Sequence, residues 1–396
     1  MPARVLISSP SAEARLRAAI DALSEGDRGR QGLLIAPTRA AADECAAAAA
    51  LARGGLFGVG RTSVIELVMR LALPRLSRQG LTPTSAIGAE AVVARARFDA
   101  VQEGALNYFA PVAGTPGFPR AAARTLDELQ MAGVAPSRLA SLDLAGADLA
   151  TLLEGLTRES TKAGTVSRAG LWAAAAAALV EDQALDAETA LVLLDVPITS
   201  VAEERFVAAL LARKGRVTIT VPAADRRTLA ALARLGIDVT TPPAGPAAHR
   251  AARGGRRAAA PLALARLQQH LFAIDNPPAG AIDESVSLFS APGEGRETVE
   301  VARRVLAEAD RGVPFDEIAI LLRAPHTYFG LLEHALARAG VPAWFERGTR
   351  RPDPAGRAFL ALLACADEHL SARRFAEYLS LGQVPVAAIR AQPIGA

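Results

Sequence analysis

The chain has 396 residues, with 44 basic and 41 acidic side chains and a formal net charge of +3 at pH 7. At about 100–200 residues per domain, this length favours two or three domains. Only two basic residues are lysines, Lys162 and Lys214, and neither follows a glycine-rich loop, which excludes an intact P-loop nucleotide site. With only two cysteines, Cys45 and Cys365, a disulfide framework and a cysteine-rich metal site are also excluded.

The sequence shows neither a membrane segment nor an export signal. Its longest apolar runs, such as residues 171–180, are shorter than the roughly 18 residues that a membrane-spanning helix requires. Residues 1–5 (MPARV) lack the charged and then apolar pattern of a signal peptide. We therefore expect a cytoplasmic protein without a membrane partner. The small positive charge is compatible with a nucleic-acid partner but does not require one.

The first 73 residues alternate between short apolar runs and amphipathic stretches. Strands are predicted over residues 4–8, 32–36 and 59–62, and helices over residues 12–23, 40–51 and 63–73. Ser11 is suited to cap the first of these helices. Alternating strands and helices predict an α/β fold, in which helices cover a parallel sheet.

Residues 74–188 have a different pattern, because helical periodicity dominates and no strand is predicted. Helices are expected over residues 89–102, 118–132, 147–162 and 167–182. Strands return at residues 190–195 and 216–221, with helices over residues 201–213 and 225–235. The sequence therefore predicts an all-α insertion, residues 74–188, within a domain formed by residues 1–73 and 189–240.

The remaining residues predict a linker and a second, partial α/β domain. The linker is assigned to residues 241–284, because residues 242–261 are rich in Ala, Gly, Pro and Arg. The partial domain is assigned to residues 285–396. Its strands are expected at residues 286–290, 315–323 and 341–345, and its helices at residues 297–309, 328–339, 357–370 and 372–381.

Two features of a nucleotide-binding sheet are present only in altered form. The turn after the first strand, a common phosphate site, holds Ser8, Ser9 and Ser11 but no glycine or lysine, so an ordinary capped turn is favoured. Asp195 ends an apolar strand, where an aspartate can hold Mg²⁺, but a valine and a proline follow it instead of a catalytic glutamate. A structural aspartate is therefore favoured. No catalytic residue and no metal site is predicted.

Two Thr–Arg pairs are candidates for binding DNA. Thr38-Arg39 follows the second predicted strand and Arg61-Thr62 ends the third, and ligands gather at the carboxyl edge of open α/β sheets. Hydroxyl and guanidinium groups at that edge can contact phosphates and fix the position of a nucleic-acid backbone. The alternative is that both arginines are ordinary surface residues.

Aromatic residues that could stack on bases are few, since Phe, Trp and Tyr together make up 4% of the chain. Phe57, Tyr108 and Trp344 are the candidates. The five histidines show no metal-ligand spacing.

Several segments, in this order, resemble the helicase-like part of AddB-type proteins, the subunits that carry a PD-(D/E)XK nuclease and are related to superfamily 1 helicases. Residues 33–44 (LLIAPTRAAADE) resemble the motif with which these proteins meet single-stranded DNA, and residues 58–73 (GVGRTSVIELVMRLAL) resemble the block that follows. Residues 103–136 are similar to the helical insertion 1B, residues 191–213 to the Walker B region, and residues 287–381 to the start of domain 2A.

This resemblance implies two RecA-like parallel-sheet domains, 1A and 2A as in UvrD-type helicases, with insertion 1B in the first. It implies a role in double-strand-break repair and DNA recombination, with single- or double-stranded DNA and an AddA-like helicase–nuclease motor subunit as partners. The degenerate phosphate loop (Ser8, Ser9, Ser11) and the degenerate Walker B residue (Asp195) imply a DNA-scanning module without ATP hydrolysis.

The family's ATP, Mg²⁺ and nuclease domain, and the iron–sulfur cluster of some members, are expected outside this chain, which resembles a truncated member. Two alternatives stay open. In the first, the chain is a divergent nucleotide-dependent enzyme with an altered phosphate site. In the second, it is a structural protein-interaction subunit that does not contact DNA.

Overall fold

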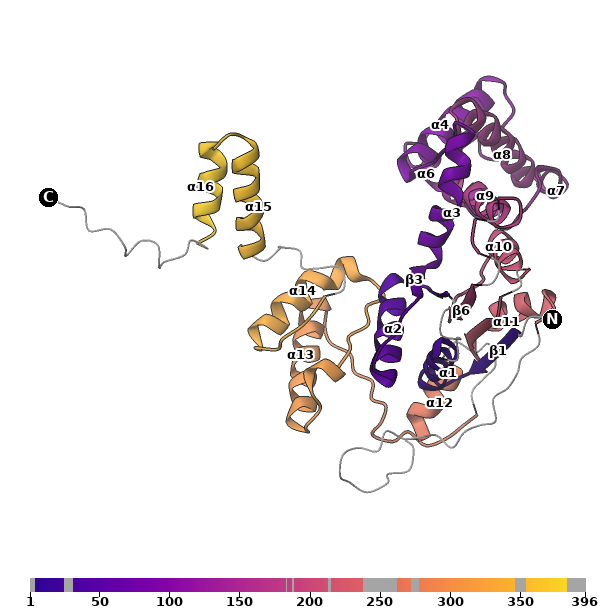
Figure 1. Cartoon of the computed structure of the whole chain (residues 1–396). Helices are drawn as coiled ribbons and strands as arrows, with labels where there is room; N and C mark the ends of the chain where they lie inside the picture. The colour runs from indigo at the N-terminus through magenta and orange to yellow at the C-terminus, as the bar shows by residue number, and fades with distance from the viewer. Residues whose placement is uncertain are drawn as a thin grey trace. The chain divides into compact units, whose positions relative to one another are not determined.

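The computed structural model describes residues 4–24, 31–182, 184–186, 189–212, 215–237, 262–271, 278–345 and 354–382 (Figure 1). The chain forms two units, an N-terminal unit ending at Val286 and a C-terminal unit beginning at Ser287. Each unit has hydrophobic clusters of its own.

The N-terminal unit is built on a five-stranded parallel sheet, which confirms the predicted α/β fold. Its strands are β1 (Arg4–Ser9), β2 (Gly32–Ala36), β3 (Val59–Ser63), β6 (Ala190–Leu194) and β7 (Val217–Pro222). They lie in the order β1-β7-β6-β2-β3, and Gly32 is opposite both Val59 and Ala190. Because every pair is parallel, the carboxyl ends of all five strands lie at one edge of the sheet.

Both faces of this sheet are buried under helices. Along β2, Leu33 and Ile35 belong to one hydrophobic cluster, whereas Leu34 and Ala36 belong to the other, as the two-residue period of a strand requires. Helices α1 (Ala12–Ser24) and α2 (Arg39–Arg53) cover one face, and α3 (Val64–Arg78), α9 (Arg168–Val180), α10 (Val201–Leu211) and α11 (Arg226–Arg234) contribute to the cluster on the other. A strand covered on both faces is apolar along most of its length, which is why the central strands β2, β6 and β7 are recognisable in the sequence.

The insertion between α3 and α9 has a hydrophobic core separate from the sheet. Its helices are α4 (Ala86–Gln102), α5 (Ala110–Ala113), α6 (Phe118–Met131), α7 (Pro136–Ala140) and α8 (Leu144–Lys162). Leu126 and Leu152 lie fully buried in that core, and Figure 1 shows α4, α6 and α8 gathered together. Helix α9, predicted as part of the insertion, instead packs Trp172 edge-on against Phe206 in the cluster of the sheet.

The insertion is not all-helical, which corrects the sequence prediction. Two short parallel strands, β4 (Thr82–Pro83) and β5 (Thr165–Val166), pair with each other before α4 and after α8. The Thr82 N–H donates to the Gly164 carbonyl at 3.0 Å, and the Thr84 N–H donates to the Val166 carbonyl at 2.9 Å. Strands of two residues are too short for a pattern of alternation, so the sequence gives no signal of this small sheet.

The C-terminal unit contains helices α13 (Glu294–Asp310), α14 (Pro325–Arg338), α15 (Pro354–Asp367) and α16 (Ala372–Ser380). The prediction of strands at residues 286–290, 315–323 and 341–345 was wrong, and all three segments are among the described residues. Residues 315–317 form a 3₁₀ helix, and none of the three segments contains a strand. Leu288 is 99% and Leu321 94% exposed, so these apolar segments lack the covering layer and partner strand that would hold them in a sheet.

A second RecA-like parallel sheet is therefore absent from the described part of the C-terminal unit. Residues 242–261 of the predicted linker lie outside the described residues, and a short helix, α12 (Leu262–His270), lies within the range assigned to the linker. The assignment of the units to helicase-like domains stays a prediction.

Candidate nucleic-acid interface and phosphate turn

In the turn between β1 and α1, the hydroxyls of Ser9 and Ser11 accept hydrogen bonds from nearby backbone N–H groups. The Ser11 hydroxyl accepts a hydrogen bond from the Ala14 N–H at 3.2 Å, which confirms the predicted cap of α1. The Ser9 hydroxyl accepts from the Ser11 N–H at 3.1 Å. Both hydroxyls are thus engaged by the backbone of the turn itself, in line with the interpretation as a capped turn.

Asp195 stands directly after β6 and is held by an ion pair that was not predicted from the sequence. Arg15, on the first turns of α1, donates from Nε to both carboxylate oxygens of Asp195, at 2.9 and 3.0 Å. An Nη nitrogen of Arg15 also donates to the Ser9 carbonyl at 2.5 Å. The Thr220 hydroxyl, from β7 between β1 and β6, donates to Asp195 at 2.8 Å. One guanidinium therefore joins the carboxyl ends of β1 and β6.

The sequence gives only a weak signal of this pair, because 180 residues separate its two partners. An arginine on the apolar side of a short helix is the available hint. The side chain of Arg15 is 8% exposed, and a buried arginine requires a partner.

The four predicted DNA-binding residues lie close together around the carboxyl ends of β2 and β3. Residue 62 is opposite residue 35 in the sheet, and Thr38 begins α2 two residues after β2 ends. The Thr38 hydroxyl accepts from the Ala41 N–H at 3.1 Å, and buried Thr62 donates to the Ser63 carbonyl at 3.1 Å. The Thr62 hydroxyl therefore already donates its proton to the backbone, whereas the Thr38 hydroxyl only accepts and still has a proton to donate. The two arginines are the charged groups of the four that can bind a phosphate.

Arg39 and Arg61 share their charge with two carboxylates. Arg39 Nε donates to both oxygens of Asp43 at 3.2 Å, and an Arg61 nitrogen lies 3.5 Å from the same carboxylate. A second nitrogen of Arg39 lies 4.0 Å from Glu66. All four side chains are between 44% and 49% exposed, so a ligand in solution can reach them. We call these four residues the Arg39 cluster.

Glu66 also belongs to the capping box of α3. It accepts from the Ser63 N–H at 2.9 Å, while the Ser63 hydroxyl accepts from the Glu66 N–H at 3.3 Å. The backbone hydrogen bond from Ser63 is the largest cause that lowers the pKa of Glu66, and the charge of Arg39 adds to it. Glu66 is therefore ionised at neutral pH, and it contributes one negative charge to the Arg39 cluster.

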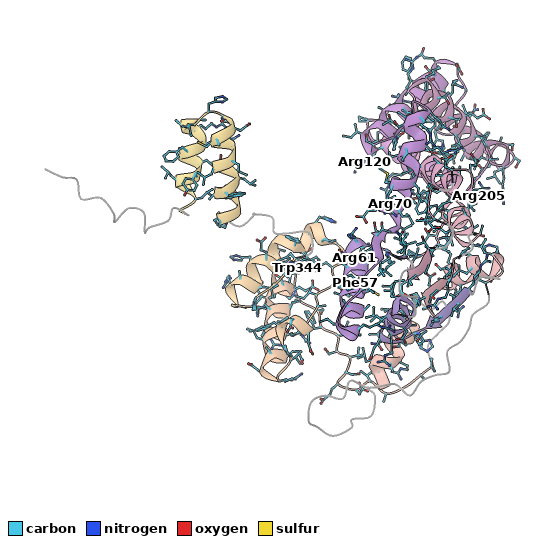
Figure 2. All side chains as sticks on the ribbon, in the orientation of Figure 1. Phe57, Arg61, Arg70, Arg120, Arg205 and Trp344 are labelled. Atoms are coloured by element: carbon cyan, nitrogen blue, oxygen red, sulfur yellow. The ribbon has the colours of Figure 1, made fainter. Side chains whose placement is uncertain are left out.

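The three aromatic candidates belong to different parts of the chain: the sheet, the insertion and the C-terminal unit. Phe57, labelled in Figure 2, is 94% exposed and precedes β3. It therefore lies at the amino end of that strand, whereas Thr38 follows the carboxyl end of β2. Tyr108 lies in the insertion and packs edge-on against Phe109, with ring centroids 5.0 Å apart. Trp344 is 83% exposed in the C-terminal unit. Within the described part of the N-terminal unit, neither Phe57 nor Tyr108 contributes to the Arg39 cluster.

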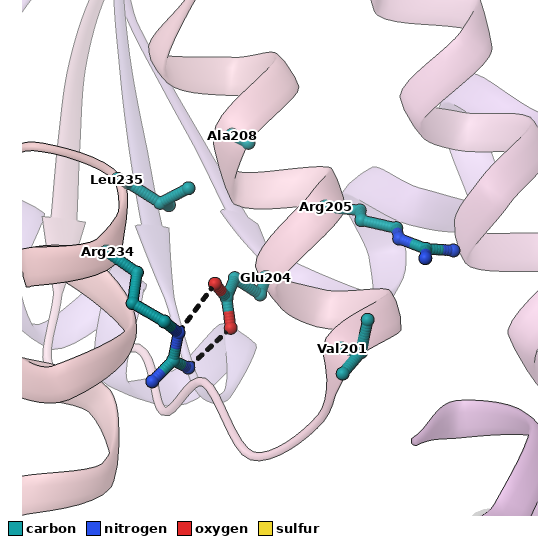
Figure 3. A pocket seen from close by; sticks show the side chains of 6 residues that line it. All are labelled: Val201, Glu204, Arg205, Ala208, Arg234 and Leu235. Atoms are coloured by element: carbon teal, nitrogen blue, oxygen red, sulfur yellow. Dashed lines mark hydrogen bonds and ion pairs between the residues drawn. The ribbon is translucent and has the colours of Figure 1, made fainter. Parts of the chain in front are cut away.

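An open depression of about 520 Å³ lies between α10 and α11 (Figure 3). Its lining residues are Val201, Glu204, Arg205, Ala208, Arg234 and Leu235. Arg234 donates two hydrogen bonds to Glu204, at 2.6 and 3.0 Å, and these bonds lower the pKa of Glu204. Figure 3 shows Arg205 directed away from that pair. None of the predicted site residues lines this depression.

No group of three or more His, Cys, Asp or Glu side chains is arranged to hold a metal ion anywhere in the described ranges. His249 lies outside them. Within the same ranges, no helix combines the length and the apolar composition that crossing a membrane requires.

Comparison with known proteins gives one partial similarity. No protein-family model matches the chain. A stretch of 91 residues, 23% of this chain, is 33% identical to the B subunit of the ATP-dependent helicase/deoxyribonuclease of Pelotomaculum thermopropionicum. That stretch spans 8% of the length of the relative. The chain therefore has a distant, partial similarity to one component of a helicase–deoxyribonuclease.

Proposed function

We propose that this chain is a helicase-like module that binds DNA without hydrolysing ATP, in an AddB-like subunit of a double-strand-break repair helicase–nuclease. The partial similarity to the B subunit of a helicase/deoxyribonuclease supports the DNA-processing context. Single-stranded or double-stranded DNA and an AddA-like motor subunit are the partners that this function requires. ATP, Mg²⁺ and an iron–sulfur cluster belong, on this proposal, to other parts of the complex.

The Arg39 cluster is the observation that carries the DNA-binding part of the proposal. Two half-exposed guanidinium groups stand at the edge of the sheet where open α/β folds bind ligands. Arginine suits this role because its planar fork of N–H donors matches the oxygens of a phosphate. The contact is to the nucleic-acid backbone, which fixes position but does not read sequence.

The turn after β1 supports the absence of ATP hydrolysis. A phosphate loop offers free backbone N–H groups and a lysine. Here the N–H groups of Ser11 and Ala14 donate to the Ser9 and Ser11 hydroxyls, and the nearby carboxylate is paired with Arg15. The alternative of a divergent nucleotide-dependent enzyme requires this pair to open. The alternative of an interaction subunit without DNA contact gives the Arg39 cluster no role.

A binding titration with a fluorescent single-stranded oligonucleotide tests the proposal. The full chain is compared with Arg39→Ala and with Arg17→Ala, a control that removes an exposed, ion-paired arginine from α1. We expect Arg39→Ala to weaken binding by about threefold to tenfold, and Arg17→Ala to have a smaller effect. Equal affinities of the two variants would show that the Arg39 cluster does not contact DNA. If the wild-type chain does not bind the oligonucleotide, the alternative of an interaction subunit is favoured.

A further inference from the structure

The ion pair between Arg15 and Asp195 is the most completely built polar site among the described residues of the sheet edge. The guanidinium bonds both oxygens of the carboxylate and one backbone carbonyl, so three of its contacts are made within the protein. The side chain of Arg15 is 8% exposed and that of Asp195 27% exposed. The pair is thus nearly shielded from water on the arginine side and partly open on the aspartate side.

The backbone of Asp195 is held in a conformation that few residues adopt. Its φ is +50°, in the left-handed region that is strained for most residues with a side chain. The Asp195 N–H donates to both the carbonyl and the hydroxyl of Thr220, each at 3.1 Å. Together with the bonds from Arg15 and from the Thr220 hydroxyl, these contacts fix the position of the carboxylate.

The place of this carboxylate is one where an open parallel sheet ordinarily binds a ligand. It lies at the carboxyl edge, beside the turn between the first strand and the first helix, and the next residues along the chain are Val196 and Pro197. An aspartate in this place, bonded by a hydroxyl, has the chemistry of a ligand for a small cation. In this chain the guanidinium of Arg15 is the cation.

We propose that Arg15 is a built-in cation that permanently occupies the cation position of Asp195, and so closes the turn after β1 to external metal ions and phosphates. Arg15 is a positioning residue: it acts by holding Asp195 and the Ser9 carbonyl together across β7. This inference rests on the part of the proposed function that excludes ATP hydrolysis, and its test does not depend on whether the chain binds DNA. Without the Arg15 side chain, the Asp195 carboxylate has no cationic partner and can bind a small cation from solution.

Chemical rescue tests this assignment with a readout that an ordinary loss of packing does not change. Thermal unfolding of the full chain is measured for the wild type, Arg15→Ala and the control Arg17→Ala, each with about 20 mM guanidinium chloride or sodium chloride, a concentration far too low to denature. Arg17 lies on the same helix but is 58% exposed in its pair with Glu13. We expect Arg15→Ala to lower Tm by about 5 °C or more, and Arg17→Ala to leave it nearly unchanged.

Guanidinium should restore about 1 °C or more of the Tm of Arg15→Ala, relative to sodium chloride, and should not raise that of the control. The double variant Arg15→Ala/Asp195→Asn should show no such rescue, because asparagine tolerates the same backbone region but lacks the charge. The single variants Arg15→Ala and Asp195→Asn should each lower Tm as well. The sum of their two decreases in Tm should exceed the decrease in the double variant, because the two residues act as one pair.

The proposal is overturned if guanidinium has the same effect on Arg15→Ala and on the double variant, or if the two losses are additive. If Arg15→Ala does not fold, Asp195→Asn and Arg15→Lys carry the test. Lysine retains the charge without the fork, so its Tm should fall between that of Asp195→Asn and the wild type. A Tm of Arg15→Lys at or below that of Asp195→Asn contradicts the assignment.

Discussion

Two acidic side chains, Asp43 and Glu66, limit how strongly Arg39 and Arg61 can attract a phosphate. Asp43 lies within 3.5 Å of both arginines, so a phosphate must compete with it for each of them. The sequence predicts a role in binding for the two arginines but not the part that these carboxylates play. A residue pattern indicates which edge of the sheet a side chain reaches, but it does not show which opposite charges, on other elements, meet it there.

Removal of the Asp43 charge should therefore strengthen DNA binding. We expect Asp43→Asn to raise the affinity for single-stranded DNA by about twofold to fivefold at low salt, because both arginines lose a competing anion. Fluorescence anisotropy measures this change. Glu13→Gln is the matched control, since it also removes one exposed carboxylate from an i,i+4 pair with an arginine, on α1. The same gain in both variants would attribute the effect to net charge alone.

Cys45 should be inert in the folded chain. It is buried between α2 and the sheet, and this burial raises the pKa of its thiol to about 11. Because only the thiolate reacts, alkylation by iodoacetamide at pH 8 should be slower than in the unfolded chain by about a hundredfold or more. Mass spectrometry of the Cys45 peptide reports the rate. The same shift makes the free energy of unfolding depend on pH. It is unaffected by Cys45 below about pH 9 and falls as the pH rises from 9 towards 11, because the thiol ionises first in the unfolded chain. Labelling of native Cys45 at the unfolded rate contradicts this placement.

At the scale of elements, a buried aspartate joins the insertion's longest helix to the loop before α5. Asp148 on α8 is 1% exposed and accepts from the N–H groups of Asn107, at 3.0 and 3.1 Å, and of Phe109, at 2.8 Å. These N–H groups have no other partner among the hydrogen bonds of the described residues. The carboxylate therefore takes the place of backbone pairing in this loop.

Asp148→Ala should destabilise the insertion markedly. It removes the charged acceptor of two partly buried N–H groups. A hydrogen bond to a charged group contributes about 1.5–3 kcal/mol, so we expect a loss of about 2 kcal/mol or more in the free energy of unfolding. Denaturant unfolding followed by circular dichroism measures it. Asp148→Asn keeps one acceptor oxygen and should lose less. If both variants unfold at the wild-type midpoint, Asp148 does not support the loop.

The elements of the N-terminal unit could be predicted because both of their signals are local. The apolar runs that form β1, β2, β6 and β7, and the capping residue Ser11, are visible in a few neighbouring residues. The strands predicted in the C-terminal unit have similar local signals, yet they do not form. A strand needs a partner to bond its backbone, and the sequence of the strand does not say whether the partner is present.

At the scale of the molecule, the parallel sheet of the N-terminal unit presents two different sites at one edge. At β1 and β6, Arg15 is buried and Asp195 neutralises its charge in an ion pair. At β2 and β3, Arg39 and Arg61 stay half exposed beside Asp43 and Glu66. The first arrangement stabilises the fold, whereas the second leaves two guanidinium groups accessible to a ligand that competes with Asp43 and Glu66 for them. This difference in burial is the physical basis for proposing DNA binding without nucleotide hydrolysis.

The salt dependence of single-stranded DNA binding tests this central proposal most directly. Affinity is measured for the wild type and for Arg39→Ala/Arg61→Ala at several salt concentrations. If the two arginines each neutralise a phosphate, log K should fall linearly with log salt, and the double variant should reduce the slope by about 1.4, or about 0.7 for each arginine removed. The proposal is contradicted if the wild type does not bind, if its affinity does not depend on salt, or if the double variant keeps the wild-type slope.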